Sequence, residues 1–108
     1  MFDELDNLAR QVINFDIKAG VGGRRATGSS SGYGKTLKFL ISRKRITLAQ
    51  FARACNMSGQ AFNHIVNHSR QENFTERELD LYCSRLGCDR KWLDVLADRV
   101  YKLMGGDK

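Results

Sequence analysis

Hydrophobic residues recur along this chain mostly at spacings of three and four, the period of an amphipathic α-helix. The first such stretch covers residues 2 to about 18, and further stretches follow one another from residue 35 onward. No segment alternates apolar and polar residues convincingly, as a half-buried strand would. The pattern therefore predicts an all-α fold. The stripe of the first stretch consists of Phe2, Leu5, Leu8, Val12 and Phe15, widened by Ala9 and Ile13.

Residues 20–34, between these stretches, are rich in glycine and serine and include Arg24 and Arg25. Glycine loses much backbone entropy on ordering, so a regular element is disfavoured here. We expect a flexible basic linker over 20–34. The chain is thus predicted to consist of an N-terminal amphipathic helix at 1–19, this linker, and a helical domain at 35–108.

Capping and turn residues predict where the helices of the domain at 35–108 begin and end. Thr75 and Glu78 have the spacing of a capping box. Asn56 stands at a turn, where asparagine tolerates a left-handed backbone, and Gly87 is placed to end a helix. After a helix over 36–45, we expect helices to begin at the caps Thr47, Ser58, Thr75 and Asp89.

Two short helices joined by a tight turn occupy residues 47–67. Small Ala52, four positions before Asn56, allows the two helices to cross closely. The second helix, 58–67, then has one face toward the core and one toward solvent. We expect its inward residues to be Ala61, Phe62, Ile65 and Val66.

The net charge of +6 is distributed unevenly. No acid occurs from Lys18 to Arg70, and such a surface attracts polyanions because each neutralised phosphate releases counterions. A solvated basic face is the simpler alternative. An anionic lipid surface is another, although no helix combines a strong apolar face with a lysine-rich one. The bases of the stretch are Lys18, Arg24, Arg25, Lys35, Lys38, Arg43, Lys44, Arg45, Arg53 and Arg70.

Residues 47–58 (TLAQFARACNMS), followed by Phe62 and Ile65, resemble the helix-turn-helix of the lambda-repressor-like (Cro and phage-repressor, XRE-type) family. Residues 86–89 (LGCD) and 92–93 (WL) resemble the closing turn and fifth helix of that family. The resemblance implies a five-helix domain that binds double-stranded DNA as a transcriptional regulator, most often a dimeric repressor. The chain departs from the family at Asn56, where glycine is common, and at Leu48, where glutamine is frequent.

By this resemblance the exposed face of helix 58–67 enters the major groove. Gln60 and Asn63 each offer a donor and an acceptor together, the pair that recognises adenine, and His64 suits a guanine edge. The expected base-contacting residues are Ser58, Gly59, Gln60, Asn63 and His64. The expected phosphate-binding residues, at helix N-termini or on basic side chains, are Arg43, Lys44, Arg45, Thr47, Arg53 and Arg70. Arg24 and Arg25 are candidates for a minor-groove arm.

A single module of this size buries limited area, so specific binding usually requires a symmetric dimer on two half-sites. We expect the dimer surface on the last helix, with the helix at 1–19 as second choice. A different class of function is a protein-interaction module, such as an antitoxin, with residues 1–19 binding the partner. RNA is disfavoured because aromatic residues do not interleave with the basic stretch. Some residues of the last helix must also close the core, and the sequence does not divide the two roles. The candidate dimer residues are Trp92, Leu96, Val100, Tyr101, Leu103 and Met104.

Catalysis and cofactor binding find little support in the sequence. Residues 29–36 (SSSGYGKT) lack the first glycine of a phosphate-binding loop and follow no predicted strand. His64 and His68 share a helix face, but further metal ligands are not evident. We therefore expect no enzyme activity, no cofactor and no metal.

The cysteines and the start of the chain bear on the compartment. The three cysteines are odd in number and form no CxxC pair, so we expect reduced, partly buried thiols. No apolar run approaches the about 20 residues of a membrane span. The acidic start lacks the features of an export signal. We expect a cytoplasmic protein that does not enter membranes.

Overall fold

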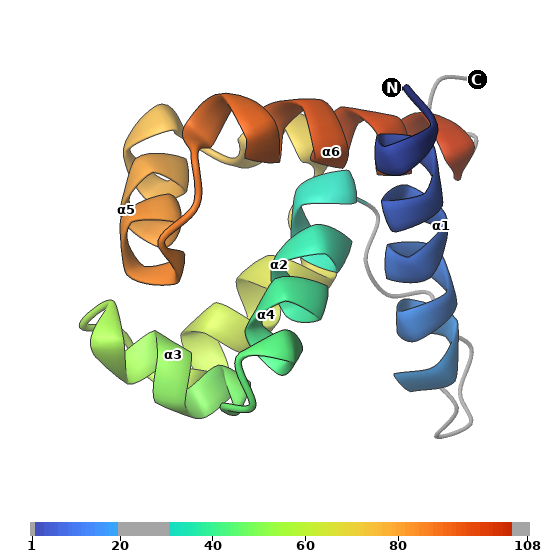
Figure 1. Cartoon of the computed structure of the whole chain (residues 1–108). Coiled ribbons are helices and arrows are strands. Elements are labelled where there is room, and N and C mark those ends of the chain that lie inside the picture. The colour runs from blue at the N-terminus through green and yellow to red at the C-terminus, as the bar shows by residue number, and fades with distance from the viewer. Residues whose placement is uncertain (1, 20–30, 105–108) are drawn as a thin grey trace.

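The computed structural model describes residues 2–19 and 31–104, and within these ranges the chain forms six α-helices, one short 3₁₀ helix and no β-strand (Figure 1). The prediction of an all-α fold is confirmed. No helix in these ranges is long and apolar enough to cross a membrane. The elements are α1 (Phe2–Ala19), α2 (Gly32–Arg43), α3 (Leu48–Ala54), α4 (Gly59–His68), the 3₁₀ helix η2 (Gln71–Asn73), α5 (Glu76–Leu86) and α6 (Arg90–Leu103).

Four helices begin at the side-chain caps that the sequence predicted. In each, the cap oxygen accepts a hydrogen bond from the backbone N–H three residues later, at 3.0 to 3.2 Å. Gly87 ends α5 in the left-handed conformation, with φ of 77°. Each side-chain cap stabilises its helix by about 1 kcal/mol, so these boundaries are determined locally. The caps are Thr47 of α3, Ser58 of α4, Thr75 of α5 and Asp89 of α6.

Helix α2 begins inside the segment that we expected to be a flexible linker, so the expected boundary at residue 34 is wrong. Ser31 caps α2 by accepting a hydrogen bond from the N–H of Gly34 at 2.9 Å, and both residues are buried. A Cβ on Gly32 would overlap the carbonyl oxygen of Ala97 in α6. A Cβ on Gly34 would overlap the carbonyl oxygen of Val66 in α4. The two glycines are therefore needed for the close approach of α2 to its neighbours.

The first N–H groups of α2 already have hydrogen-bond acceptors. The side-chain Oε1 of Gln71, in η2, accepts from the N–H of Gly32 at 2.7 Å and of Tyr33 at 3.2 Å. The third N–H donates to the Ser31 cap. A phosphate-binding loop leaves such N–H groups free for its ligand. In residues 31–34 the serine and the glycines of this motif therefore serve helix capping and packing.

Apolar side chains form two cores that share α2 and α6. The larger core contains an aromatic cluster in which the ring centroids of Phe51 and Tyr82 lie 5.3 and 5.4 Å from that of Phe62. Figure 1 shows α6 crossing one end of the molecule from α5 to α1, which explains why it contributes to both cores. The smaller core lies between α1, α2 and α6 and consists of Ala9, Val12, Phe39, Leu96 and Val100.

Helix α1 is packed against the other helices through its predicted apolar stripe. Ala9 and Val12 are fully buried against α2 and α6. An ion pair adds to this contact, because Arg99 Nη1 of α6 donates to Asp6 Oδ1 at 2.6 Å. Partner binding by residues 1–19 stays a prediction. The centre of the apolar stripe faces the core and is not presented to a partner.

Helix α6 divides the residues that we expected to form a dimer surface. Leu96 and Val100 are fully buried against α1, so they belong to the core and the expectation is wrong for them. Leu103 is 46% exposed, and Val95, which we had not included, is 44% exposed. The remaining candidates, Trp92, Tyr101 and Met104, are half-buried.

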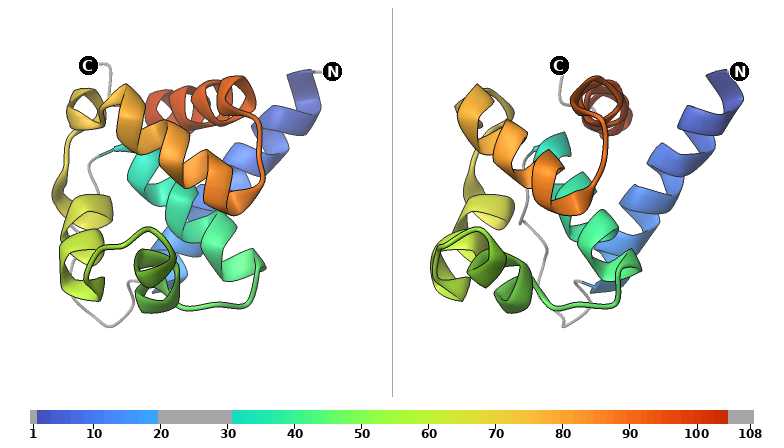
Figure 2. Two further views of the ribbon diagram at one scale, coloured as in Figure 1. Left: turned by 90° about the vertical axis from the view of Figure 1, so that its left-hand side faces the viewer. Right: turned by 60° about the vertical axis from the view of Figure 1, so that its left-hand side comes forward.

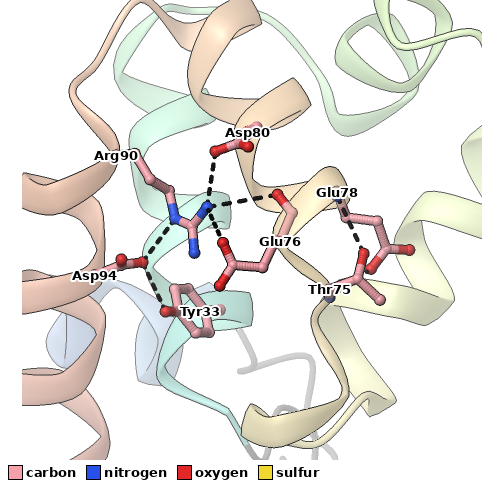
Figure 3. Close-up of polar contacts among 7 residues, drawn as sticks. All are labelled: Tyr33, Thr75, Glu76, Glu78, Asp80, Arg90 and Asp94. Atoms are coloured by element: carbon pink, nitrogen blue, oxygen red, sulfur yellow. Dashed lines mark hydrogen bonds and ion pairs between the residues drawn. The ribbon is translucent and has the colours of Figure 1, made fainter.

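A polar cluster joins α5, α6 and α2 (Figure 3). Arg90 donates from Nη1 to Asp80 at 2.7 Å and from Nε to Asp94 at 2.9 Å. Its Nη1 also lies 3.4 Å from Oε1 of Glu76. Asp94 accepts a further hydrogen bond from the Tyr33 hydroxyl at 2.8 Å. Burial, together with this bond to the Asp94 carboxylate, raises the pKa of Tyr33 to about 12.

Candidate nucleic-acid interface

The turn at residues 55–58 places α4 across α3. Asn56 adopts the predicted left-handed backbone, with φ of 62°. The N–H of Met57 donates to the carbonyl of Ala52 at 2.9 Å, and Ala52 is fully buried. A Cβ on Gly59 would lie 3.2 Å from the Cβ of Ala49, so the start of α4 lies directly against α3. Figure 2 shows both helices together at the end of the molecule opposite α6.

Helix α4 has one buried and one exposed face. Phe62 and Val66 are fully buried, and Ile65 is half-buried. Ala61 is exposed, so its expected inward position is wrong and the buried stripe is narrower than we predicted. Of the expected base-contacting residues, Ser58, Gln60, Asn63 and His64 are exposed and Gly59 is half-buried.

Hydrogen bonds orient the side chain of Asn63. Lys38 Nζ, in α2, donates to Asn67 Oδ1 at 2.7 Å. Asn67 Nδ2 donates in turn to Asn63 Oδ1 at 2.6 Å and to the Asn63 carbonyl at 2.9 Å. An ammonium group can only donate, so Lys38 determines which atom of the Asn67 amide is the oxygen. Asn67 then determines the orientation of Asn63, whose Nδ2 is left to donate to a ligand.

His64 and His68 lie side by side on α4, with ring centroids 4.8 Å apart and planes inclined by 37°. The part of the chain that the structure describes contains no group of three or more potential metal ligands. Both imidazoles lie on the exposed side of α4.

Basic side chains without an acidic partner among the described residues surround α3 and α4. They come from the end of α2, the connection to α3, α3 itself and the segment after α4. Where both partners of an ion pair are described residues, the bases are Arg90, Arg99 and Lys102, which lie on α6. The acids of α5 and α6 are thus partly neutralised within the protein, and the cations near α4 are available to an external anion. These exposed cations are Arg43, Lys44, Arg45, Arg53 and Arg70.

Thr47 and Ser58, the expected phosphate contact and base contact at the starts of α3 and α4, differ in which of their groups are already hydrogen-bonded. Thr47 Oγ1 accepts from the N–H of Gln50, and its own N–H donates to Gln50 Oε1 at 2.8 Å, so this backbone donor is already used. Ser58 Oγ accepts from the N–H of Ala61 at 3.1 Å. Both hydroxyl groups remain exposed and keep a proton to donate. Arg24 and Arg25, the predicted minor-groove arm, lie outside the described residues.

Arg45 has a left-handed backbone, with φ of 61°, in the connection between α2 and α3. Its N–H donates to the carbonyl of Ser42 at 3.0 Å, which closes the turn. This conformation costs a residue with a Cβ about 1–2 kcal/mol. The sequence did not predict it, because arginine is not typical of such positions. Arg45 is exposed and forms no ion pair with a residue that the structure describes.

The cysteines are free thiols, with Cys55 and Cys83 buried and Cys88 half-buried. Burial raises the pKa of Cys83 to about 12, and a hydrogen bond with Cys88 adds to this effect. Burial also raises the pKa of Cys55. A raised pKa disfavours the reactive thiolate form of Cys55 and Cys83.

Sequence reasoning missed Lys38 and Asn67 as residues of the site. The spacing of Asn63 and Asn67, four residues apart on one helix, was a visible signal of their contact. The contribution of Lys38 was not visible, because it comes from another helix.

No family model matches the chain, and neither the curated proteins nor the solved structures include a match to it.

Proposed function

We propose that this chain is a sequence-specific double-stranded DNA-binding transcriptional regulator. In this proposal α3 and α4 form a helix-turn-helix similar to that of the lambda-repressor-like family, within a five-helix domain made by α2 to α6. Helix α4 enters the major groove. The observation that supports it most is the exposed polar face of α4, surrounded by cations that have no acidic partner among the described residues.

The charges favour a polyanion with a regular spacing of phosphates. The five exposed cations come from several segments around α3 and α4 and so span a surface instead of a single point. If each neutralises one phosphate, the logarithm of the binding constant falls with the logarithm of salt concentration with a slope of about −4.5. The hydroxyl groups of Thr47 and Ser58 add two hydrogen-bond donors to this surface.

The polar side chains of α4 favour duplex DNA over a surface that is only charged. Gln60 and His64 are exposed, and each side chain carries groups that can donate and accept hydrogen bonds. Asn63 offers its Nδ2 as a donor and one remaining lone pair of Oδ1 as an acceptor. Such groups distinguish base pairs at their major-groove edges. We infer that the outward donor of Asn63 contacts an acceptor such as N7 of a purine.

A dimer is the expected active form because two half-sites are needed for useful specificity. Among the side chains of residues 4–15 and 31–104, the large exposed apolar ones are Leu103 and Val95, and both lie on α6. We propose that α6 pairs with its copy through this outward face. By analogy with the family, the dimer represses transcription by occupying an operator.

Selection from a random duplex library at two salt concentrations tests this function. We expect an enriched, nearly palindromic sequence whose binding weakens steeply with salt. The variants Gln60→Ala and Asn63→Ala should each lower affinity for that sequence by about 1–3 kcal/mol and hardly change affinity for random DNA. No enrichment at either salt concentration would contradict the proposal.

Two charge variants separate fixed contacts from general attraction. Arg53→Ala should weaken binding to selected and random DNA alike and should reduce the salt slope by about 0.9. Lys91→Ala is the matched control, since Lys91 is an exposed base on α6, at the opposite end of the molecule. If both variants changed the salt slope equally, phosphate contacts would not be centred on α3 and α4.

A further inference from the structure

An apolar cleft of about 280 Å³ lies between α1, the end of α2, the end of α5 and the first turn of α6. Its walls include Leu8, Leu40, Leu86 and Trp92. No residue of α3 or α4 lines it, so the cleft is separate from the face proposed to bind bases. Its volume falls just below the about 300–1,000 Å³ of typical small-ligand sites, which suits a compact ligand.

Two cations and the thiol of Cys88 complete the lining of this cleft. Arg43 is the last residue of α2 and Lys44 its C-cap, and both are exposed. Neither forms an ion pair with a residue that the structure describes. The guanidinium of Arg43 lies over the Phe39 ring of α2, 5.3 Å from its centroid. The cleft therefore combines apolar walls with a positively charged edge.

We propose that this cleft binds a small amphiphilic anion, with a carboxylate or sulfonate group and a compact aromatic or aliphatic body. The body would displace water from the apolar walls, which is favourable in proportion to the area covered. The anionic group would pair with Arg43 and Lys44 at the edge. A neutral ligand forgoes that ion pair, and a cationic ligand is repelled.

Ligand binding would also affect DNA binding, and this part rests on the proposed function. Arg43 and Lys44 are expected phosphate contacts, and they directly precede the connection to α3. A bound carboxylate would compete with DNA phosphates for the same two cations. The anion therefore weakens DNA binding, and by linkage DNA weakens binding of the anion by the same factor.

Trp92 makes the binding step measurable without DNA, because it is the one tryptophan of the chain and it lines the cleft. The full chain is titrated with 4-phenylbutyrate and octanoate and followed by tryptophan fluorescence. The matched probes are 4-phenylbutyramide, which is neutral, and 4-phenylbutylamine, which is cationic. We expect saturable binding of the anions, with affinity at least about tenfold above that of the amide. Absence of saturation, or equal affinity for anion and amide, overturns the proposal.

Variants locate the site. The double variant Arg43→Gln with Lys44→Gln should remove the preference for the anion over the amide. Arg53→Gln with Arg70→Gln removes two exposed cations elsewhere and should leave that preference intact. Unchanged thermal melting shows that each variant is folded. If the second pair abolished the preference as fully as the first, the anion would be attracted by general charge and the assigned site would be wrong.

The DNA step has its own readout. With the selected duplex, 4-phenylbutyrate should lower the affinity of the unaltered protein but not that of the Arg43→Gln, Lys44→Gln variant. Binding seen by fluorescence with no change in DNA affinity would refute the competition while supporting the site. If no duplex is selected at all, the proposed function fails, and the fluorescence titration alone decides whether the cleft binds anions.

Discussion

Arg45→Gly should make the protein more stable, although it removes a side chain and adds a glycine. The left-handed backbone of Arg45 costs about 1–2 kcal/mol in a residue with a Cβ, and glycine removes this cost. Glycine also adds backbone entropy to the unfolded chain, which offsets about 0.5–1 kcal/mol of the gain. The exposed Arg45 side chain forms no ion pair with a described residue, so little else is lost. The net expectation is an increase of about 0.5–1 kcal/mol in the free energy of unfolding.

Arg53→Gly is the matched substitution. Arg53 is exposed like Arg45 but lies inside α3, where glycine lowers helix stability by about 1 kcal/mol. The same change of residue type should therefore have opposite signs at the two positions. Urea unfolding, followed by circular dichroism at constant pH, measures both. If Arg45→Gly destabilised the protein as Arg53→Gly does, the argument from backbone strain would be refuted.

The same pair of variants separates stability from DNA binding. Each loses one positive charge beside the proposed interface, so each should lower the salt slope of DNA binding by about 0.9. Arg45→Lys keeps the charge and the strained backbone, and it should keep the slope as well. A more stable protein that binds DNA more weakly is thus expected for Arg45→Gly alone. If its salt slope equalled that of the unaltered protein, Arg45 would not contact phosphate.

Four further substitutions address orientation, packing and titration. Asn67→Asp keeps an oxygen that accepts from Lys38 but removes the N–H that donates to Asn63. The Asn63 amide should then turn and present its oxygen outward. Library selection should therefore show, at one position, a preference for a base with a donor on its major-groove edge. Gly32→Ala places a Cβ against the backbone of α6 and should lower the free energy of unfolding by about 3 kcal/mol. Gly87→Ala meets no atom within 4 Å, so only its left-handed backbone should cost stability, by about 1 kcal/mol. Tyr33 has a folded-state pKa of about 12 against an ordinary value of 10.0, so the unfolded chain loses this proton first and stability falls between these two pH values. Tyr33→Phe should flatten that part of the curve of urea midpoint against pH.

Each of these expectations has an outcome that contradicts it. An unchanged selected sequence for Asn67→Asp would mean that the hydrogen bonds from α2 do not orient Asn63. If both glycine substitutions lowered the free energy of unfolding equally, the α2–α6 crossing would be able to widen without cost. An unaltered alkaline slope in Tyr33→Phe would assign the slope to other groups, such as the thiol of Cys83, whose pKa is also about 12.

Features that depend on neighbouring residues were predictable from the sequence. The caps at Thr47, Ser58, Thr75 and Asp89 and the left-handed Asn56 involve partners within a few residues. The exposed face of α4 was predicted from the helical spacing of its apolar residues. These predictions needed no knowledge of where the other helices lie.

Features that depend on distant segments were not predictable. The start of α2 was missed because Gly32 and Gly34 disfavour a helix locally, while the contacts that favour it come from α4, α6 and Gln71, 39 residues beyond Gly32. The roles of Leu96 and Val100 could not be assigned, because the helical period shows only that these residues face an apolar surface. It does not show whether that surface is the protein's own core or a second copy of the chain. The orientation of Asn63 depends on Lys38 in the same way.

The docking of α1 on α6 has a consequence for the order of folding. The ion pair between Asp6 and Arg99 joins residues 93 positions apart, and Val12 and Val100 belong to the same core. Closing so long a loop costs entropy that only a nearly complete α2–α6 surface can offset. We therefore expect α1 to be the last helix to join during folding. In native-state hydrogen exchange its amides should open before those of α4 and α5.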